Sequence, residues 1–330
     1  MFMEEERDAF SADNSKFELL AQAVTRVREE IQKVIIGQDK FIDMMLAALF
    51  SGGHILVEGV PGIAKTLTSR LLAQTLQLEF SRIQFTPDLM PGDVLGTTVY
   101  NAKHGEFSFN PGPIFSNLVL IDEINRAPAK TQAALFEVME EAQITVDGRT
   151  YPMDNIFFVM ATQNPIEQEG TYKLPEAQLD RFLLKIVLQY PSLEEEQAML
   201  RRFRQDFRIN IRQKISQILN ARDILAFHQL IEQVNIQDEL LDYIAQIVHN
   251  TRNHGDLFLG ASPRASLAIL KVSKAIAAMR GRDFVTPDDI QYVVFPVLQH
   301  RVLLTPEREM EGYLVADVIQ EILAEVPVPR

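Results

Sequence analysis

Cysteine is absent from all 330 residues of the sequence. Its absence excludes disulfide bonds, catalysis by a thiolate and zinc sites built from cysteine. Long hydrophobic runs are also missing, because no stretch reaches the roughly 18 uncharged apolar residues that a membrane-spanning helix requires. Residues 1–6 are acidic where a secretory signal peptide is basic. We therefore expect a cytoplasmic protein without a membrane span.

Positive charge is scarce. The sequence has 32 Lys and Arg residues against 45 Asp and Glu residues, which leaves a formal net charge of −13 and a pI near 5.0. Proteins that bind nucleic acid usually present a broad basic face, so nucleic acid is not an expected partner, although a local basic channel stays compatible with this balance. The six histidines show no spacing typical of metal ligands, and no G-x-S-x-G motif is present.

The composition is otherwise that of a globular protein, 47% hydrophobic and 23% charged, and the length suggests two domains. Apolar runs of strand length alternate with helical patterns up to residue 190, which predicts an α/β domain with a mostly parallel sheet covered on both faces. Beyond that point only helical periodicity continues. We therefore predict domains at 1–190 and 191–330, the second all-helical. The expected strands are 54–58, 80–85, 118–122, 156–161 and 183–188. The expected helices are 16–34 with a capping box at Ser15 and Glu18, one ending at 50, 65–77, 130–142, 175–181, 193–205, 221–233, 236–250, 263–279 and one beginning at 287.

Two segments interrupt the alternation of strands and helices. Residues 86–113 are rich in proline and glycine and are too long for a plain connection, so we interpret them as a functional insertion. Residues 143–153 place Asp147 and Gly148 between two alternating runs, a pattern typical of a β-hairpin.

Residues 59–66 read GVPGIAKT and lie between an expected strand and an expected helix, the context that a phosphate-binding loop requires. In such a loop backbone N–H groups surround the phosphates, Lys65 reaches the β- and γ-phosphates, and the Thr66 hydroxyl holds Mg²⁺. Ala64 replaces the second glycine of the general pattern, and alanine is tolerated there at a negative φ. The alternative interpretation is a glycine turn that carries a surface lysine.

Residues 117–123 read NLVLIDE, an apolar strand that ends in two acids. With a phosphate-binding loop upstream, we expect Asp122 to bind Mg²⁺ through water and Glu123 to act as the general base toward the attacking water. Acids commonly follow strands, so a solvated pair at a strand end is the alternative.

Three further residues are candidates for contact with the phosphates. Asn164 follows an expected strand, and its amide suits a hydrogen bond to the attacking water; the alternative is a turn asparagine. Arg181 suits an arginine finger acting on a neighbouring subunit's ATP, and a surface ion pair with Asp180 or Glu176 is the alternative. Arg264 opposes the helix dipole in a first turn, which indicates a role beyond helix stability, such as contact with the nucleotide from the lid; a surface arginine is the alternative.

Five ordered motifs together resemble the MoxR family of AAA+ ATPases, over nearly the whole chain from about residue 36 to residue 304. The motifs are GVPGIAKT at 59–66, DEINRA at 122–127, ATQNP at 161–165, LPEAQLDRF at 174–182 and SPR at 262–264. The resemblance implies a P-loop AAA+ αβα sandwich with a five-stranded parallel sheet of order 5-1-4-3-2 and an all-helical C-terminal lid domain. It identifies the inserts at 86–113 and 143–153 with the helix-2 insert and the pre-sensor hairpin, which line the central pore in related machines.

The resemblance also implies roles for individual residues. The implied catalytic residues are Lys65, Glu123, Asn164 as sensor 1 and Arg181 as the arginine finger. The implied ATP-binding residues are Ile36, Gly37, Gly59, Val60, Pro61, Gly62, Ile63, Ala64, Lys65, Thr66, Leu67 and Arg264, the last as sensor 2. The implied Mg²⁺ residues are Thr66 and Asp122. Asn125 and Arg126 belong to the family signature, and the resemblance assigns them no individual role.

The resemblance implies a chaperone-like ATPase that remodels or matures a client protein or inserts its metal cofactor. It further implies a ring of identical subunits, typically a hexamer, and a von Willebrand A-domain protein as partner. A magnesium-chelatase-like subunit and a nucleic-acid motor of the same fold are alternatives, as is a nucleotide-dependent scaffold that hydrolyses little ATP. A nucleic-acid motor would need basic residues at the hairpin tip, where only Arg149 stands beside Asp147 and Gly148. A scaffold that hydrolyses little ATP would not need a general base, a water-orienting amide or an arginine finger, so the presence of Glu123, Asn164 and Arg181 speaks against it.

Overall fold

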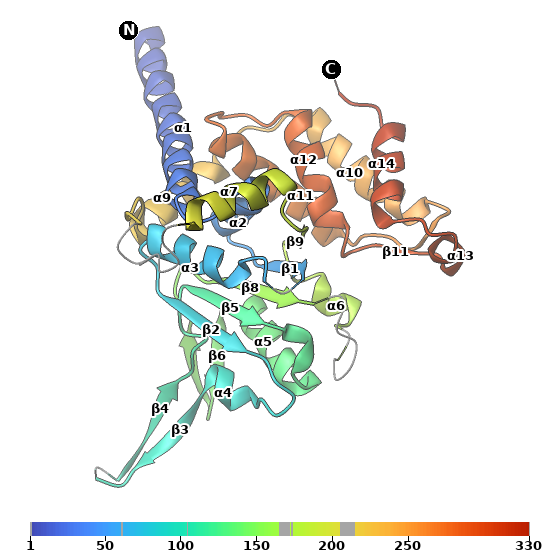
Figure 1. Ribbon diagram of the computed structural model, residues 1–330. Helices are drawn as coiled ribbons and strands as arrows, with labels where there is room; N and C mark the ends of the chain where they lie inside the picture. Colours follow the sequence, from blue (N-terminus) through green and yellow to red (C-terminus); the bar gives the residue numbers. More distant parts are fainter. Residues whose placement is uncertain are drawn as a thin grey trace.

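The computed structural model describes residues 2–60, 62–103, 105–164, 172, 174–204 and 215–329. Its centre is a parallel five-stranded sheet with the order β2-β5-β8-β1-β9 (Figure 1). Counted along the chain and read from β9, this order is 5-1-4-3-2, so the expected sheet is confirmed. The strands are β1 (Ile55–Gly59), β2 (Phe80–Gln84), β5 (Leu118–Asp122), β8 (Phe158–Gln163) and β9 (Leu184–Leu188).

Different helices cover the two faces of the sheet, and alternation along each strand decides which face a side chain joins. In β5, Leu118 and Leu120 belong to an apolar core shared with α1, α2 and α3. Val119 and Ile121 face the other way and belong to a second core shared with α5. All of β5 is buried because both faces are covered. These helices are α1 (Phe2–Gln32), α2 (Asp39–Phe50), α3 (Lys65–Thr75) and α5 (Ala129–Glu141).

The first helix begins earlier than expected. α1 starts at Phe2 and runs through Ser15, so the capping box that we expected at Ser15 and Glu18 is wrong. The reason is that no glycine or proline precedes Ser15, and nothing in that stretch stops a helix.

The C-terminal part of the chain is mainly helical, and capping boxes at Ser192 with Glu195 and at Thr286 with Asp289 begin two of its helices. It also contains a short antiparallel ladder of two strands, which are too short to show a period in the sequence. α1 and α2 contact α9 and α11, so the first apolar core continues from the sheet into the lid. No helix of the described ranges is both long enough and apolar enough to cross a membrane. The elements here are α7 (Leu193–Phe203), α9 (Ala221–Glu232), α10 (Asp238–Asn253), β10 (Leu257–Leu259), α11 (Pro263–Met279), α12 (Pro287–Leu298), β11 (Leu303–Leu304), α13 (Pro306–Met310) and α14 (Val315–Glu325).

Two hairpins extend from the sheet on the side away from the lid (Figure 1). The expected hairpin is confirmed, with Asp147 at φ +51° and Gly148 at φ +74° in its turn. It contacts the hairpin of the insertion: the rings of Phe109 and Tyr151 stack with centroids 4.3 Å apart, and the Thr98 hydroxyl donates to Asp147 Oδ2 at 2.6 Å. The elements are α4 (Pro91–Leu95), β3 (Gly96–Asn101), β4 (Glu106–Pro111), β6 (Gln143–Val146) and β7 (Arg149–Pro152).

Candidate nucleotide site

The expected phosphate loop lies at the carboxyl edge of the sheet, between the end of β1 and the start of α3. A Cβ at Gly59 would lie 2.7 Å from Ile63 Cδ1 and 3.0 Å from the Leu188 carbonyl oxygen, so glycine is required there. Gly62 has φ +89°, and no atom lies within 4 Å of where its Cβ would be, so this face of the loop is open. Pro61 lies outside the described residues. The partly buried residues around the same loop are Val60, Ala64, Lys65, Thr66 and Leu67.

Ala64 adopts φ +60° and ψ +20°, in the left-handed region, so the negative φ at which we considered alanine tolerable is not adopted there. The helix begins at the next residue, and the chain makes its turn from loop into helix at Ala64 itself. As the N-cap of α3, Ala64 has no side-chain oxygen to accept a hydrogen bond from the first-turn N–H groups. The start of α3 therefore offers those N–H groups to an anion such as a phosphate.

Lys65 folds back over the loop, where its Nζ donates a 2.7 Å hydrogen bond to the Gly59 carbonyl. Burial lowers the pKa of Lys65 from its ordinary value, and the negative charges of Asp122, Glu123 and Glu58 oppose that shift. The fold thus brings the lysine of the loop within electrostatic reach of both acids of the second motif, as the sequence predicts.

Asp122 ends β5 and is buried, with both carboxylate oxygens engaged. Its Oδ2 accepts from Arg82 Nε at 2.5 Å, and its Oδ1 accepts from the Thr162 hydroxyl at 3.1 Å. The same Thr162 oxygen accepts from the Glu123 backbone N–H at 3.0 Å. Thr162, on the neighbouring strand β8, therefore orients both acids.

Glu123 directly follows β5 at φ +58°. Its Oε2 accepts from Gln84 Nε2 at 2.7 Å and lies 3.1 Å from Arg126 Nε, in the short helix η1 (Ile124–Arg126). Asn125 is buried, and its carbonyl accepts from the Tyr172 N–H at 2.6 Å. The carboxylate that we expect to act as a base is thus held here by an amide and a guanidinium.

Asn164 is buried directly after the end of β8. Because β8 lies between β5 and β1 in the sheet, its end falls between the acid pair and the phosphate loop. This is the position that a residue oriented toward the attacking water requires.

The segment of Ile36 and Gly37 is joined to the phosphate loop by the next residue. Gln38 Nε2 donates to the Ile63 carbonyl at 2.8 Å. Gly37 has φ +71°, and a Cβ there would collide with the carboxylate of Glu195 in the first turn of α7. The segment is therefore held between the loop and α7, and Gln38 is a contact that the sequence analysis did not single out.

Arg181 and Arg264 meet at one carboxylate. Arg181 Nη2 lies 2.9 Å from Glu140 Oε2, and Arg264 Nη2 donates to Glu140 Oε1 at 2.7 Å. The ion-pair partner of Arg181 is therefore Glu140 and not Asp180 or Glu176, and the Asp180 carboxylate is bound by Arg301 and Ser262 of the lid. The two arginines thus form a second cluster, where α6 (Glu176–Leu179), α5 and α11 come together.

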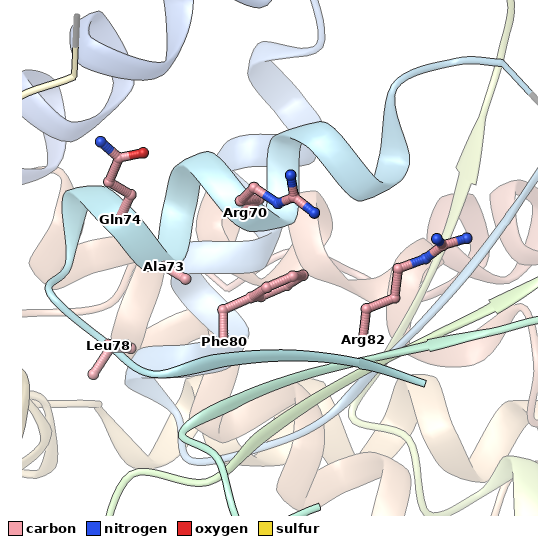
Figure 2. Close-up of a pocket in the computed structure, with 6 residues that line it drawn as sticks. All are labelled: Arg70, Ala73, Gln74, Leu78, Phe80 and Arg82. Atoms are coloured by element: carbon pink, nitrogen blue, oxygen red, sulfur yellow. The ribbon is translucent and has the colours of Figure 1, made fainter. Parts of the chain in front are cut away.

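The sequence analysis missed Arg82, Gln84, Thr162 and Glu140. The sequence did contain a signal for Arg82 and Gln84. These residues are two apart on β2 and so lie on the same face of the sheet, and β2 pairs with β5, the strand that ends in the two acids. Arg82 also lines an open hollow of about 390 Å³ between α3 and β2, in which Arg70 lies over the Phe80 ring (Figure 2). The hollow is lined by Arg70, Ala73, Gln74, Leu78, Phe80 and Arg82. None of its lining residues is an expected ATP contact. The hollow therefore differs from the nucleotide site, and Arg82 connects the two through its hydrogen bond to Asp122.

These features define an AAA+ ATPase: a phosphate loop after β1, an acid pair at the end of β5, this order of strands and a helical lid. In the sheet, β8 alone separates β5 from β1. The chain is an ATP hydrolase. A family model described as "ATPase family associated with various cellular activities (AAA)" matches residues 54–184, and one described as "AAA lid domain" matches residues 249–322. The chain belongs to the MoxR family within this class, as its similarity to curated relatives demonstrates.

Three similar proteins cover almost the full chain. Chaperone MoxR1 of Mycobacterium tuberculosis is 44% identical, over 91% of this chain and 81% of its own. Uncharacterized protein YeaC of Bacillus subtilis is 46% identical, over 94% of this chain and 95% of its own. The crystal structure of a protein described as an ATPase from Cytophaga hutchinsonii superposes with a TM-score of 0.90 at 42% identity, over 98% of this chain and 99% of its own.

Proposed function

We propose that this ATPase is a cytoplasmic, chaperone-like motor that works as a ring, typically a hexamer. It remodels or matures a client protein, or inserts a metal cofactor into it. Its partner is a von Willebrand A-domain protein. The observation that carries the proposal is the projecting hairpin β3–β4, whose Tyr100 and Phe107 are 55% and 71% exposed with ring centroids 5.1 Å apart. Its base is fastened to the hairpin β6–β7, which continues directly from α5. An exposed aromatic pair on a projecting hairpin suits contact with a protein client. The resemblance to a relative named a chaperone points the same way.

We assign the chemistry of the site as follows. The loop amides and Lys65 bind the β- and γ-phosphates, and Asn164 orients the attacking water. Glu123 takes the proton of that water, which requires its carboxylate to leave Gln84 and Arg126, since a carboxylate held by a guanidinium is a weaker base. Arg264 contacts the nucleotide from the lid, and Arg181 completes the site of the neighbouring subunit.

The donor set at the loop suits Mg²⁺. The Thr66 hydroxyl and the Asp122 carboxylate are hard oxygen donors, and a carboxylate already oriented by Arg82 and Thr162 suits contact through water better than direct ligation. A bound Mg²⁺ would neutralise charge on the phosphate oxygens. We place the boundary between the nucleotide-binding and lid domains at residue 190, where β9 has ended and α7 has not begun.

The test is capture of clients by a variant locked with ATP. Glu123→Gln should bind ATP, hydrolyse it slowly and retain its client, whereas Lys65→Ala should lose the nucleotide and serve as the empty control. Mass spectrometry then identifies proteins held only by the locked form. A von Willebrand A-domain protein or an enzyme awaiting its cofactor supports the proposal. Chelatase subunits or nucleic acid in that fraction contradict it, and normal turnover by Glu123→Gln contradicts the general-base assignment.

A further inference from the structure

Arg301 is an arginine buried where the lid meets the nucleotide-binding part. It follows α12, and only 3% of its side chain is exposed. A buried guanidinium is unfavourable unless its donors are satisfied. Here every donor has an acceptor: four hydrogen bonds cross the junction, and one stays within the lid. The acceptors are the Asp180 carboxylate at 2.7 Å and the carbonyls of Asp180 at 3.2 Å, Phe182 at 2.6 Å, Leu183 at 3.2 Å and Val297 at 2.5 Å.

Two of these acceptors bracket the residue that we assign as the arginine finger. The carbonyls of Asp180 and Phe182 belong to the residues immediately before and after Arg181, and one nitrogen of Arg301, Nη2, donates to both. Arg301 therefore fixes the backbone from which the Arg181 side chain extends. The planar guanidinium of Arg301 presents several N–H donors in fixed directions and so reaches both carbonyls at once. The ammonium group of a lysine does not reproduce this geometry.

The lid holds the same segment at further points. The two residues before Arg301 bind it as well: Gln299 Nε2 donates to the Lys185 carbonyl at 2.6 Å, and His300 Nε2 donates to the Phe182 carbonyl at 3.0 Å. From the start of α11, the Ser262 hydroxyl donates to Asp180 Oδ2 at 2.9 Å, and Ser262 Oγ accepts from the Arg264 N–H at 3.2 Å. The segment around Arg181 is thus attached to the lid by side chains at the end of α12 and at the start of α11.

We propose that Arg301 is the positioning residue of the arginine finger: it fastens the lid to the peptide groups on both sides of Arg181, so that lid and finger move as one body. Any rotation of the lid that follows occupancy of the subunit's own site then displaces the finger presented to the neighbouring site. The inference rests on the proposed role of Arg181 in the adjacent subunit.

Complementation in mixed rings tests the inference. Arg301→Lys keeps a positive charge beside Asp180 and loses the fork that reaches both carbonyls. Alone, it should lose at least about tenfold in kcat with KM for ATP within about twofold, because its own phosphate loop is intact. Mixed with Lys65→Ala, which has an intact finger, it should regain activity as Arg181→Ala does. Mixed with Arg181→Ala it should regain none, because both subunits then present a defective finger.

The matched control is Arg308→Lys, a lid arginine that pairs with Asp256 away from this segment; it should keep wild-type kcat. Differently tagged subunits, purified through both tags, establish that the rings have mixed. Should Arg301→Lys fail to fold, Asp180→Asn, which keeps the shape and removes the charge, should fall in the same complementation class.

Opposite results separate the two proposals. Wild-type kcat in Arg301→Lys, or no recovery with Lys65→Ala while Arg181→Ala does recover, overturns the role of Arg301 alone. No recovery of Arg181→Ala with Lys65→Ala overturns the finger itself, and the inference with it.

Discussion

Thr162 holds Asp122 and Glu123, the two acids of the site, in fixed positions relative to each other. Its hydroxyl donates to Asp122 and accepts from the Glu123 backbone, and it reaches both from the adjacent strand. Single hydrogen bonds of this kind decide where a general base points, although each contributes little to overall stability.

We therefore expect Thr162→Val, which preserves the shape, to lower kcat by about 10- to 100-fold through misplacement of Glu123. Loss of the two hydrogen bonds should reduce the free energy of unfolding by about 1–3 kcal/mol. ATP affinity should change little because Lys65 and the loop supply it. Steady-state ATPase kinetics check this, with Thr162→Ser as the control that keeps the hydroxyl. A kcat of Thr162→Val equal to that of the native protein would contradict the role of Thr162 in positioning Glu123.

Ala64 holds a left-handed conformation that is unfavourable for alanine by about 1–2 kcal/mol. We expect Ala64→Gly to relieve this strain, offset in part by about 0.4–1 kcal/mol of unfolded-state entropy, so that the protein is stabilised by roughly 0.5–1 kcal/mol. Urea denaturation measures the change. Ala133→Gly, at an exposed position inside α5, should instead destabilise by about 1 kcal/mol. Equal losses in both variants would contradict the strain.

At the scale of elements, the strands, their helices and the β6–β7 hairpin followed from the periodicity of apolar residues, because burial on one or both faces imposes it directly. The start of α1 and the β10–β11 ladder did not follow, since a helix continues wherever nothing stops it and a two-residue strand has no period. His54 illustrates what joins the elements. Its Nδ1 accepts from the Val159 N–H in β8, and its Nε2 donates to the Met139 carbonyl in α5.

Burial lowers the pKa of His54 to about 4, so the folded protein holds this imidazole neutral while the unfolded chain protonates near pH 6.5. Stability from this group is fully present above pH 6.5 and declines as the pH falls toward 4, by about 2 kcal/mol at pH 5. Burial lowers the pKa of His228 and His300 in the same direction.

We expect the free energy of unfolding to fall between pH 7 and pH 5, and His54→Gln to reduce the mean slope over this range by about 1 kcal/mol per pH unit. Denaturant titrations at several pH values measure it, with the exposed His249→Gln as the matched control. An unchanged slope in His54→Gln would show that the buried imidazole does not titrate as described.

At the scale of the whole molecule, one apolar core runs from α1 and α2 across a face of the sheet and into the lid. The polar contacts of Asp180 with Ser262 and Arg301 join the same two parts at the position of Arg181. Movement of the lid therefore bears directly on the residue that we assign to the neighbouring subunit.

If hydrolysis takes place between subunits, activity per subunit should rise with protein concentration and reach a plateau when the rings are complete, because assembly follows mass action. ATPase assays over a wide dilution series, alongside light scattering, measure this. Arg181→Ala should give a low activity at every concentration. Constant specific activity through the range in which the rings dissociate would contradict a shared site.

The sequence alone determined most of the elements, and the residues of the phosphate loop and the acid pair, because local spacing encodes periodic burial and the chemistry of a loop between a strand and a helix. Only the tertiary structure decided the partners of those residues. Sequence neighbours suggested Asp180 or Glu176 for Arg181, yet Asp180 is occupied by the lid and Arg181 meets Glu140. The left-handed turn at Ala64 and the hold of Gln84 on Glu123 likewise depend on segments that come together only in the folded chain.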